Sequence, residues 1–348
     1  MNKNLLIYGA YGYTGRLIVE ECLKNGIKPI IAGRDAEKTM TYAKKHELEY
    51  DVFEVSDRKK LENWLKRGEV VVHCAGPFIH TAKSMVQGCL ATNTHYLDIT
   101  GEFQVFDLIK EYGEKAKEKG IMLLPGTGFD VVPSDCLAKH LHNKMPNATD
   151  LKLAFVSKGG KLSRGTAKTM IENLGEPQTL RRGGDYEGIP MGKSAIEIDY
   201  GPFKQISMGI SWGDVSTAYF STGIPNIEVF SGTTEQQLSK VKRALRLSFM
   251  LRSRTIKNFL MRQMDKRSDG PEEERRKESV MYLWGKISNG VTSEEARLKT
   301  PNGYTLTAAS TVLIAQKILN GNFTIGFQTP SIAYGEKLIL EIEGCEYL

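Results

Sequence analysis

Three glycines near the start of the chain have the spacing of a loop that holds phosphate. They lie between an apolar run and an amphipathic stretch, in the motif Gly9-Ala10-Tyr11-Gly12-Tyr13-Thr14-Gly15. Glycines there let backbone amides approach a pyrophosphate, and the following helix start supplies positive potential. The spacing is GxxGxxG rather than GxGxxG and is weak alone. Its position predicts dinucleotide binding by Gly9, Tyr11, Gly12, Tyr13, Thr14 and Gly15; the alternative is a glycine-rich turn in another α/β protein.

The end of the second apolar run bears on which dinucleotide is bound. An NAD site usually has an acidic residue there, which accepts a hydrogen bond from the ribose. This chain has Arg34 there, 19 residues after Gly15, and a guanidinium can bind a 2′-phosphate through two hydrogen bonds. Lys38 lies one helical turn later, and Asp35 is expected to cap the intervening helix. The residues favour NADP over NAD, with Arg34 as a merely solvated charge being the alternative.

Two further strand ends carry residues suited to border the cofactor. Small residues that follow the fourth apolar run, Ala75, Gly76 and Pro77, are expected along the dinucleotide near the nicotinamide ribose. Asp57 follows the third run and could border the adenine. A helix cap explains Asp57 equally well.

Two aspartates are the candidates for proton chemistry. Asp130 lies just after the sixth apolar run, and Asp98 ends the fifth. Ligands of open α/β sheets bind beyond the carboxyl ends of the strands, so either carboxylate could orient a substrate or relay a proton. A turn-holding role for Asp130 stays open. Ser134 or Asp135 is expected to cap the helix that follows.

The elements that position these residues alternate along the first 125 residues. Near-continuous apolar runs, typical of strands buried on both faces, are separated by helical patterns; the runs are 4–8, 28–32, 50–55, 70–74, 96–99 and 121–124. This alternation predicts an α/β fold with a doubly wound parallel sheet.

After about residue 150 the pattern changes to strands without intervening helices, at 151–156, 196–198, 206–210, 218–221 and 227–230. Asn289-Gly290 predicts a two-residue hairpin turn between strands 278–288 and 291–300. A polar hinge over 265–277, a helix over 305–319 and a short strand over 338–342 complete the expectation. We therefore expect a dinucleotide-binding domain over 1–130, to which 304–348 return, and a second α+β domain with a largely antiparallel sheet over 131–303.

The charge of the chain is concentrated in one segment. The net charge is +6, but residues 239–267 contain ten basic residues and one acidic residue, so the rest sums to −3. Thr234 is expected to cap a helix over 235–264 with an apolar stripe and a basic face. Such a helix packs on a core with its basic face solvated, or contacts an anionic membrane or an acyl carrier. Nucleic acid is disfavoured, because no recognition motif accompanies the charge.

Other chemistries are disfavoured by what the sequence lacks. It has an odd number of cysteines, five, without CxxC spacing, and no run of about 18 apolar residues, so we expect a cytoplasmic protein. His140 and His142 lie on different faces of one helix, and no metal site is expected. The Tyr-xxx-Lys pair Tyr282 and Lys286 lies on the expected hairpin rather than on a helix.

Several motifs together resemble the saccharopine dehydrogenase-like oxidoreductases, including their trans-acting enoyl reductase branch. The resemblance is strong over 1–135 and patchy over 170–270; it rests on residues 9–15, 32–34, 74–78, 96–102, 128–135, 163–166, 270–271 and 329–330. It implies a Rossmann domain, an inserted α/β domain and a returning C-terminal segment. In saccharopine reductases a similar Gly-x-Asp-Pro turn lies at the active cleft, which supports Asp130.

These observations predict an NADP-dependent oxidoreductase. Its hydride transfer would act on a C=N, C=O or C=C bond of a small-molecule or acyl, lipid-linked substrate, because the cofactor supplies the hydride chemistry and the protein supplies position. The alternative is a non-catalytic NADP-binding or lipid-associated protein that keeps the fold. The sequence leaves a homodimer open.

Overall fold

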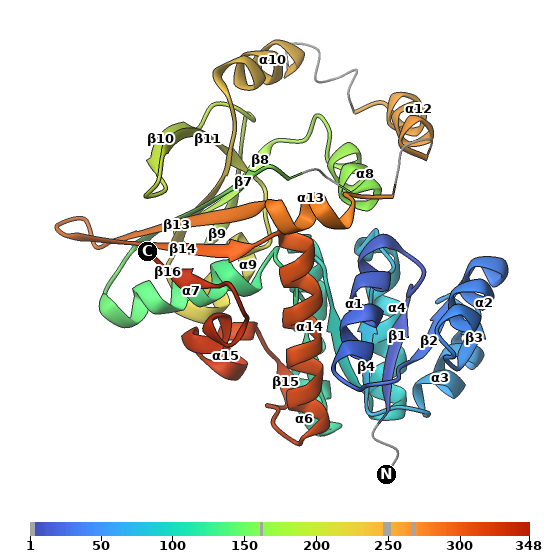
Figure 1. Ribbon diagram of the computed structural model, residues 1–348. Helices are drawn as coiled ribbons and strands as arrows, with labels where there is room; N and C mark the ends of the chain where they lie inside the picture. Colours follow the sequence, from blue (N-terminus) through green and yellow to red (C-terminus); the bar gives the residue numbers. More distant parts are fainter. Residues whose placement is uncertain (1–3, 161–162, 246–251, 266–268) are drawn as a thin grey trace. The chain divides into compact units, whose positions relative to one another are not determined.

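The computed structural model describes residues 4–160, 163–245, 252–265 and 269–348. These residues form two compact units (Figure 1). Unit 1 comprises Met1–Val132 and Gly303–Leu338, and unit 2 comprises Pro133–Asn302 and Ile339–Leu348. No helix among the described residues is long and apolar enough to cross a membrane.

Unit 1 is built on a parallel sheet, sheet A. Its described strands are β1 (Leu5–Tyr8), β2 (Ile30–Gly33), β3 (Tyr50–Val52), β4 (Val70–His73), β5 (His95–Asp98), β6 (Met122–Leu124) and β15 (Gly326–Phe327). Their order is β15-β6-β5-β4-β1-β2-β3. The chain thus adds β2 and β3 on one side of β1 and β4, β5 and β6 on the other, as in doubly wound folds. The predicted parallel sheet is confirmed, and β15, which the sequence analysis missed, extends it beside β6.

Helices connect these strands and cover the sheet (Figure 1). Those within the first part of the chain are α1 (Tyr13–Lys24), α2 (Ala36–Lys45), α3 (Arg58–Leu65), α4 (Phe78–Thr92), α5 (Phe103–Lys110) and α6 (Gly113–Glu118). The C-terminal helix α14 (Gly303–Leu319) packs beside α1, where the rings of Tyr13 and Tyr304 meet edge to face with centroids 5.1 Å apart. The chain then forms α15 (Pro330–Tyr334) and the 3₁₀ helix η1 (Glu336–Glu341).

Unit 2 is built on a mixed sheet, sheet B. Its described strands are β7 (Asp150–Lys158), β8 (Gln178–Arg182), β9 (Asp185–Ile189), β10 (Ala195–Asp199), β11 (Lys204–Ile210), β12 (Asn226–Gly232), β13 (Val280–Ser288), β14 (Ser293–Pro301) and β16 (Glu346–Tyr347). Its described helices are α7 (Val132–Lys144), α8 (Arg164–Glu172), α9 (Asp214–Thr222), α10 (Glu235–Leu245), α12 (Arg254–Asp265) and α13 (Glu273–Glu278). The sheet is largely antiparallel, as predicted, but β7 and β12 pair in parallel.

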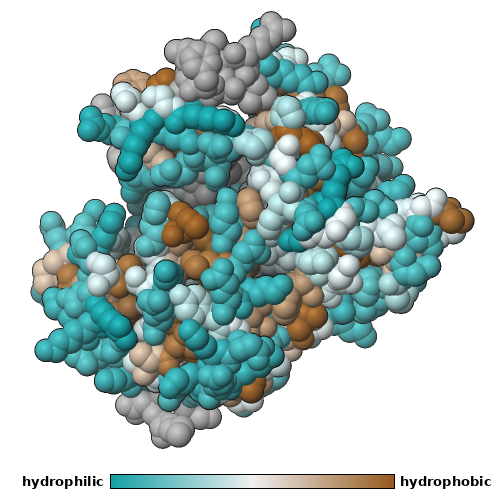
Figure 2. Space-filling model, turned by 180° about the vertical axis from the view of Figure 1, so that it is seen from behind, coloured by the Kyte–Doolittle hydropathy of each residue, from teal (hydrophilic) through white to brown (hydrophobic). Residues whose placement is uncertain are grey.

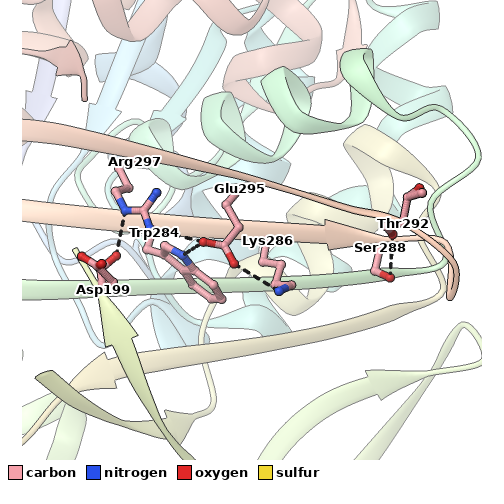
Figure 3. A network of polar contacts seen from close by, with 7 residues as sticks. All are labelled: Asp199, Trp284, Lys286, Ser288, Thr292, Glu295 and Arg297. Atoms are coloured by element: carbon pink, nitrogen blue, oxygen red, sulfur yellow. Dashed lines mark hydrogen bonds and ion pairs between the residues drawn. The ribbon is translucent and has the colours of Figure 1, made fainter. Parts of the chain in front are cut away.

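The two faces of sheet B pack differently. A Cβ atom on Gly285 would lie 2.7 Å from Leu141, so α7 approaches that face closely. Neighbouring residues of β13 point to the opposite face, where Trp284 joins a buried cluster with Tyr200 and Phe230. Polar contacts surround Trp284 on this face (Figure 3).

Several predicted elements differ from the structure. Residues 218–221 lie in helix α9 rather than a strand, because Gly213 and the left-handed Gly223 set its ends. Residues 338–342 enter a 3₁₀ helix, and part of the predicted hinge is α13. A four-residue loop, 289–292, replaces the predicted two-residue turn, because β14 starts only at Ser293. Within the loop, Asn289 Oδ1 accepts hydrogen bonds from the amides of Val291 and Thr292.

The end of the chain also differs from expectation. The sequence analysis assigned 304–348 to the first domain, but residues 339–348 belong to unit 2. There β16 pairs with β14, and Lys299 Nζ lies 2.8 Å from the Glu346 carboxylate. A two-residue strand carries too little periodic pattern to be predicted.

The predicted basic helix over 235–264 is not continuous. Thr234 does cap α10, because its Oγ1 accepts a hydrogen bond from the Gln237 amide at 3.2 Å. Arg252 and Ser253 are not helical, and α12 begins only at Arg254. Of the segment 239–267, the parts 246–251 and 266–267 lie outside the described residues.

Candidate functional site

The glycine loop leads from β1 into α1 with very little spare room. Gly9 has φ +85°, and a Cβ there would lie 3.0 Å from the Ala75 amide nitrogen. At Gly15 a Cβ would lie 2.4 Å from the Gly9 carbonyl oxygen, so α1 can approach the loop only with glycine at this position. Side chains at these places would push the loop outward and close the approach to its backbone.

The start of α1 suits an anion. Gly12 is the N-cap residue, and no side chain caps the helix there. The first amides of a helix carry partial positive charge and lack partners inside the helix. The loop and helix start therefore have the shape and charge to hold a pyrophosphate group; binding by Gly9, Tyr11, Gly12, Tyr13, Thr14 and Gly15 stays a prediction.

Tyr11 packs against the end of β2, where Arg34 follows Gly33 in the chain. A Cβ on Gly33 would be 2.4 Å from Tyr11 Cε1, so the tyrosine ring lies against the backbone just before Arg34. Arg34 is exposed and forms no ion pair with any described residue. An exposed, uncommitted guanidinium at this strand end fits a 2′-phosphate.

The two other residues predicted in this region have structural partners. Lys38 Nζ lies 2.8 Å from Asp35, whose carboxylate also caps α2 by accepting a hydrogen bond from the Lys38 amide at 3.0 Å. The predicted capping by Asp35 is confirmed. Asp57 caps α3 by accepting a hydrogen bond from the Lys60 amide at 3.2 Å. The cap that the sequence analysis left open for Asp57 is thus observed.

The segment after β4 reaches the same edge of sheet A. The close approach of Gly9 to Ala75 places the segment Ala75-Gly76-Pro77 beside the glycine loop. Helix α4 then begins at Phe78, and the Glu102 carboxylate accepts hydrogen bonds from the amides of Phe78 and Ile79 at 3.0 and 3.1 Å. Glu102 thus stabilises the start of α4, although its own backbone lies at the N-cap of α5.

Asp98 is enclosed in a hydrogen-bond network. Its side chain is fully buried and accepts hydrogen bonds from Tyr96 Oη at 2.6 Å, the Gly126 amide at 2.8 Å and the Thr100 amide at 3.0 Å. Burial raises its pKa to about 6, although the three hydrogen bonds oppose that shift. Both oxygens are occupied, so the geometry indicates that Asp98 positions the turns after β5 and β6.

Asp130 lies in the turn after β6 and is partly exposed. A Cβ on Gly101 would be 2.6 Å from Asp130 Oδ2, which places this carboxylate against the segment after β5. Loss of hydration raises its pKa to about 7, and the nearby negative charge of Glu102 contributes to the shift. A carboxyl group with such a pKa can give or take a proton near neutral pH.

Helix α14 holds the Asp130 turn in place, which the sequence analysis missed. Ser310 Oγ donates a hydrogen bond to the Thr127 carbonyl at 2.5 Å, and the Phe129 amide donates one to Thr307 Oγ1 at 2.9 Å. Thr127 and Thr311 join their hydroxyl groups at 2.9 Å. Polar residues three and four positions apart on an otherwise apolar helix were the available signal.

Asp135 and the pair Tyr282 and Lys286, which the sequence analysis also considered, belong to unit 2. Ser221 Oγ donates a hydrogen bond at 2.5 Å to the buried carboxylate of Asp135, within unit 2. Tyr282 and Lys286 lie on strand β13, as expected. Within the described residues, no group of three or more His, Cys, Asp or Glu side chains could hold a metal ion.

Comparisons with known proteins concern the domain that carries these residues. Residues 5–124 match the family model of the saccharopine dehydrogenase NADP binding domain. The human saccharopine dehydrogenase-like oxidoreductase is 26% identical over 51% of this chain and 48% of its own. The trans-acting enoyl reductase of Mycobacterium leprae is 26% identical over 57% of this chain and 52% of its own, and a lipid droplet localized protein of Caenorhabditis elegans is 23% identical over 52% and 47%.

The match extends to a solved structure. Saccharopine dehydrogenase (L-Glu forming) from Saccharomyces cerevisiae, in its apo form, has a TM-score of 0.67 at 11% identity, over 99% of this chain and 100% of that one, which shows a shared fold. The chain spans about half the length of the curated relatives it matches. The match of residues 5–124 to the saccharopine dehydrogenase NADP binding domain confirms both the resemblance and NADP as the cofactor.

Proposed function

From an NADP-binding domain of the saccharopine dehydrogenase family, we propose that this protein is an NADP-dependent oxidoreductase that reduces or oxidises a C=N, C=O or C=C bond. The observation that carries the proposal is Asp130, a carboxyl group with a pKa near 7 on the edge of sheet A where the cofactor loop lies. All strands of sheet A are parallel, so the segments after β1, β4, β5 and β6 emerge at one edge.

In the proposed reaction, the cofactor, the cofactor-binding residues and Asp130 have separate roles. NADPH or NADP supplies or accepts the hydride when bound. Gly9, Gly12 and Gly15 bring backbone amides to the pyrophosphate, and Arg34 binds the 2′-phosphate. Asp130 gives a proton to the substrate atom next to the reacting carbon during reduction and takes it back during oxidation.

We further propose that the substrate is small or lipid-linked. The names of the mycobacterial and nematode relatives, an enoyl reductase and a lipid droplet localized protein, support an acyl substrate. The five cysteines are all free thiols, which supports action in the reducing cytosol.

The test follows NADPH consumption by the purified protein with three acceptors: a cyclic imine, an aliphatic ketone and a 2-enoyl thioester. Turnover is expected with one of them. Asp130→Asn should lower kcat about 100-fold or more while NADPH affinity, measured by fluorescence titration, stays the same. Asp185→Asn, an exposed aspartate of β9, is the matched control and should keep full turnover.

Two results would contradict the proposal. Saturable NADPH binding without turnover of any acceptor would favour the non-catalytic binding protein. Full turnover by Asp130→Asn would remove this carboxyl group from the reaction.

A further inference from the structure

Helix α12 is attached to α8 by polar contacts. The two helices lie side by side in unit 2 (Figure 1). Lys257 Nζ donates a hydrogen bond to the Glu172 carbonyl at 2.5 Å, and Arg252 Nε donates one to the Gly175 carbonyl at 3.0 Å. Both carbonyls lie at or just beyond the C-terminal end of α8, where cations are favourable. These contacts hold α12 beside the end of α8.

The apolar residues of α12 are only partly covered. Ile256, Phe259, Leu260 and Met264 follow helical spacing; Phe259 is exposed and the other three are half-buried. The Phe259 side chain is 60% exposed, and Met170 on the adjoining helix α8 is 57% exposed. A helix at the surface of a globular protein normally turns such a stripe toward the core. Exposed apolar side chains that gather in this way indicate a surface for a partner.

The charges around this stripe indicate what kind of partner fits. Arg254 and Arg262 are exposed on α12 and form no ion pair with any described residue. The sequence from 239 to 264 contains no acidic residue. The acidic Glu176 is already engaged, with Arg252 and Lys257 3.7 and 3.8 Å from its carboxylate. Exposed apolar residues flanked by cations are typical of helices that lie in the surface of an anionic membrane.

We propose that α8 and α12 form a membrane-docking surface, by which the protein lies on anionic phospholipid. This surface comprises Met170, Ile256, Phe259 and Leu260, which enter the acyl boundary, and Arg254 and Arg262, which contact the phosphate groups. The proposal is independent of the proposed catalytic function, because none of these residues belongs to the NADP site.

The first test measures sedimentation of the full chain with vesicles of phosphatidylcholine containing about 30% phosphatidylserine, and with phosphatidylcholine alone. The wild type should bind the anionic vesicles and bind the neutral ones far more weakly. Replacing Phe259 and Met170 by serine should weaken binding about tenfold. Val291→Ser is the matched control, because Val291 is an apolar residue that is 91% exposed on the β13–β14 loop of the same unit. This variant should bind the anionic vesicles as the wild type does.

The second test changes the charges. Arg254→Gln with Arg262→Gln should weaken binding to anionic vesicles about thirtyfold, at roughly fivefold per charge. Hydrogen exchange should show the amides of 254–265 protected when anionic vesicles are added. The four substituted side chains, Met170, Phe259, Arg254 and Arg262, are all exposed, so the Tm of these variants should equal that of the wild type.

Three results would overturn the proposal: no wild-type binding to anionic vesicles at low salt, unchanged binding by the serine variant, or equal binding to neutral vesicles. Capture of an acyl carrier protein through the same residues, without vesicle binding, would instead make this surface a protein-docking site.

Discussion

The carboxyl-terminal edge of sheet A and the Trp284 face of sheet B both carry many polar contacts, but in different environments. At the edge of sheet A, Asp98 is fully buried and a Cβ at Gly15 would meet backbone at 2.4 Å. On sheet B, the Lys286 and Glu295 side chains are 39% and 34% exposed and form an ion pair at 3.1 Å (Figure 3). Buried polar groups lose much when a partner is removed, whereas exposed ion pairs contribute little.

The two regions therefore make different demands on sequence. The edge of sheet A tolerates few substitutions, because each removes a backbone conformation or leaves a buried group without a partner. The exposed contacts on sheet B tolerate substitution better, because each contributes little. The face of the molecule drawn in Figure 2 is likewise mostly hydrophilic, with apolar residues scattered over it. The residues proposed to bind NADP near the glycine loop lie in the constrained region.

The largest effect is expected from Asp98→Ala. The substitution leaves Tyr96 Oη and the amides of Thr100 and Gly126 without their acceptor. The free energy of unfolding, measured with urea, should fall by about 4 kcal/mol. Asp57→Ala is the control, since its carboxylate also caps backbone but is 39% exposed, and it should lose about 1 kcal/mol. Similar losses of unfolding free energy in the two variants would contradict the prediction that a buried carboxylate contributes more to stability than an exposed one.

The next effect concerns cofactor choice. Arg34→Ala should weaken NADPH binding about 100-fold, because two charge-assisted hydrogen bonds are lost, and should change NADH binding little. Lys38→Ala should weaken NADPH binding only about threefold, because its ammonium group already pairs with Asp35 at 2.8 Å. Fluorescence titration measures both. Equal losses for NADPH and NADH would contradict the role of Arg34.

The sequence reveals some residues at the edge of sheet A and hides others. The glycine loop and Arg34 are local signals, because one strand end determines their position. The role of Glu102 at the start of α4 depends on a contact between residues 23 and 24 positions apart, which no local pattern encodes. The same reason hides Ser310 and Thr307, whose partners lie in the turn after β6.

The fold shows the same limit. Apolar runs of sheet A were predictable because strands buried on both faces read as continuous apolar segments. The two-residue strands β15 and β16 exist only through their pairing with β6 and β14. The break in the basic helix at Arg252 and Ser253 was not visible, because the apolar and basic residues keep helical spacing across it.

A smaller effect is expected from Asp130→Asn on stability. The pKa of Asp130 is raised from 3.8 to about 7, so the folded state binds more protons than the unfolded state between these values. Stability from this group is present at low pH and is lost as pH rises through about 7. The variant should be more stable than the wild type by about 2 kcal/mol near pH 8 and nearly equal near pH 4.

Urea unfolding of both proteins across this pH range measures the difference. Asp98, whose pKa is raised to about 6, contributes with the same sign in both proteins and cancels in the comparison. A variant that is less stable than the wild type at high pH would contradict the raised pKa and would indicate a turn-holding role for the Asp130 carboxylate.

The smallest effect should come from Glu295→Gln on sheet B. Glu295 accepts hydrogen bonds from Trp284 Nε1 and Lys286 Nζ, both at 3.1 Å, and these groups help hold its pKa below the usual value. Its stabilising contribution is therefore present at neutral pH and lost in acid. Because the network is exposed, the loss at neutral pH should be about 0.5 kcal/mol, and added salt should reduce it further. Glu294→Gln, whose side chain points to the other face of β14, is the control and should change nothing measurable. A loss above about 2 kcal/mol for Glu295→Gln would show that this exposed network contributes as buried contacts do, and the contrast between the two sheets would then no longer follow from burial.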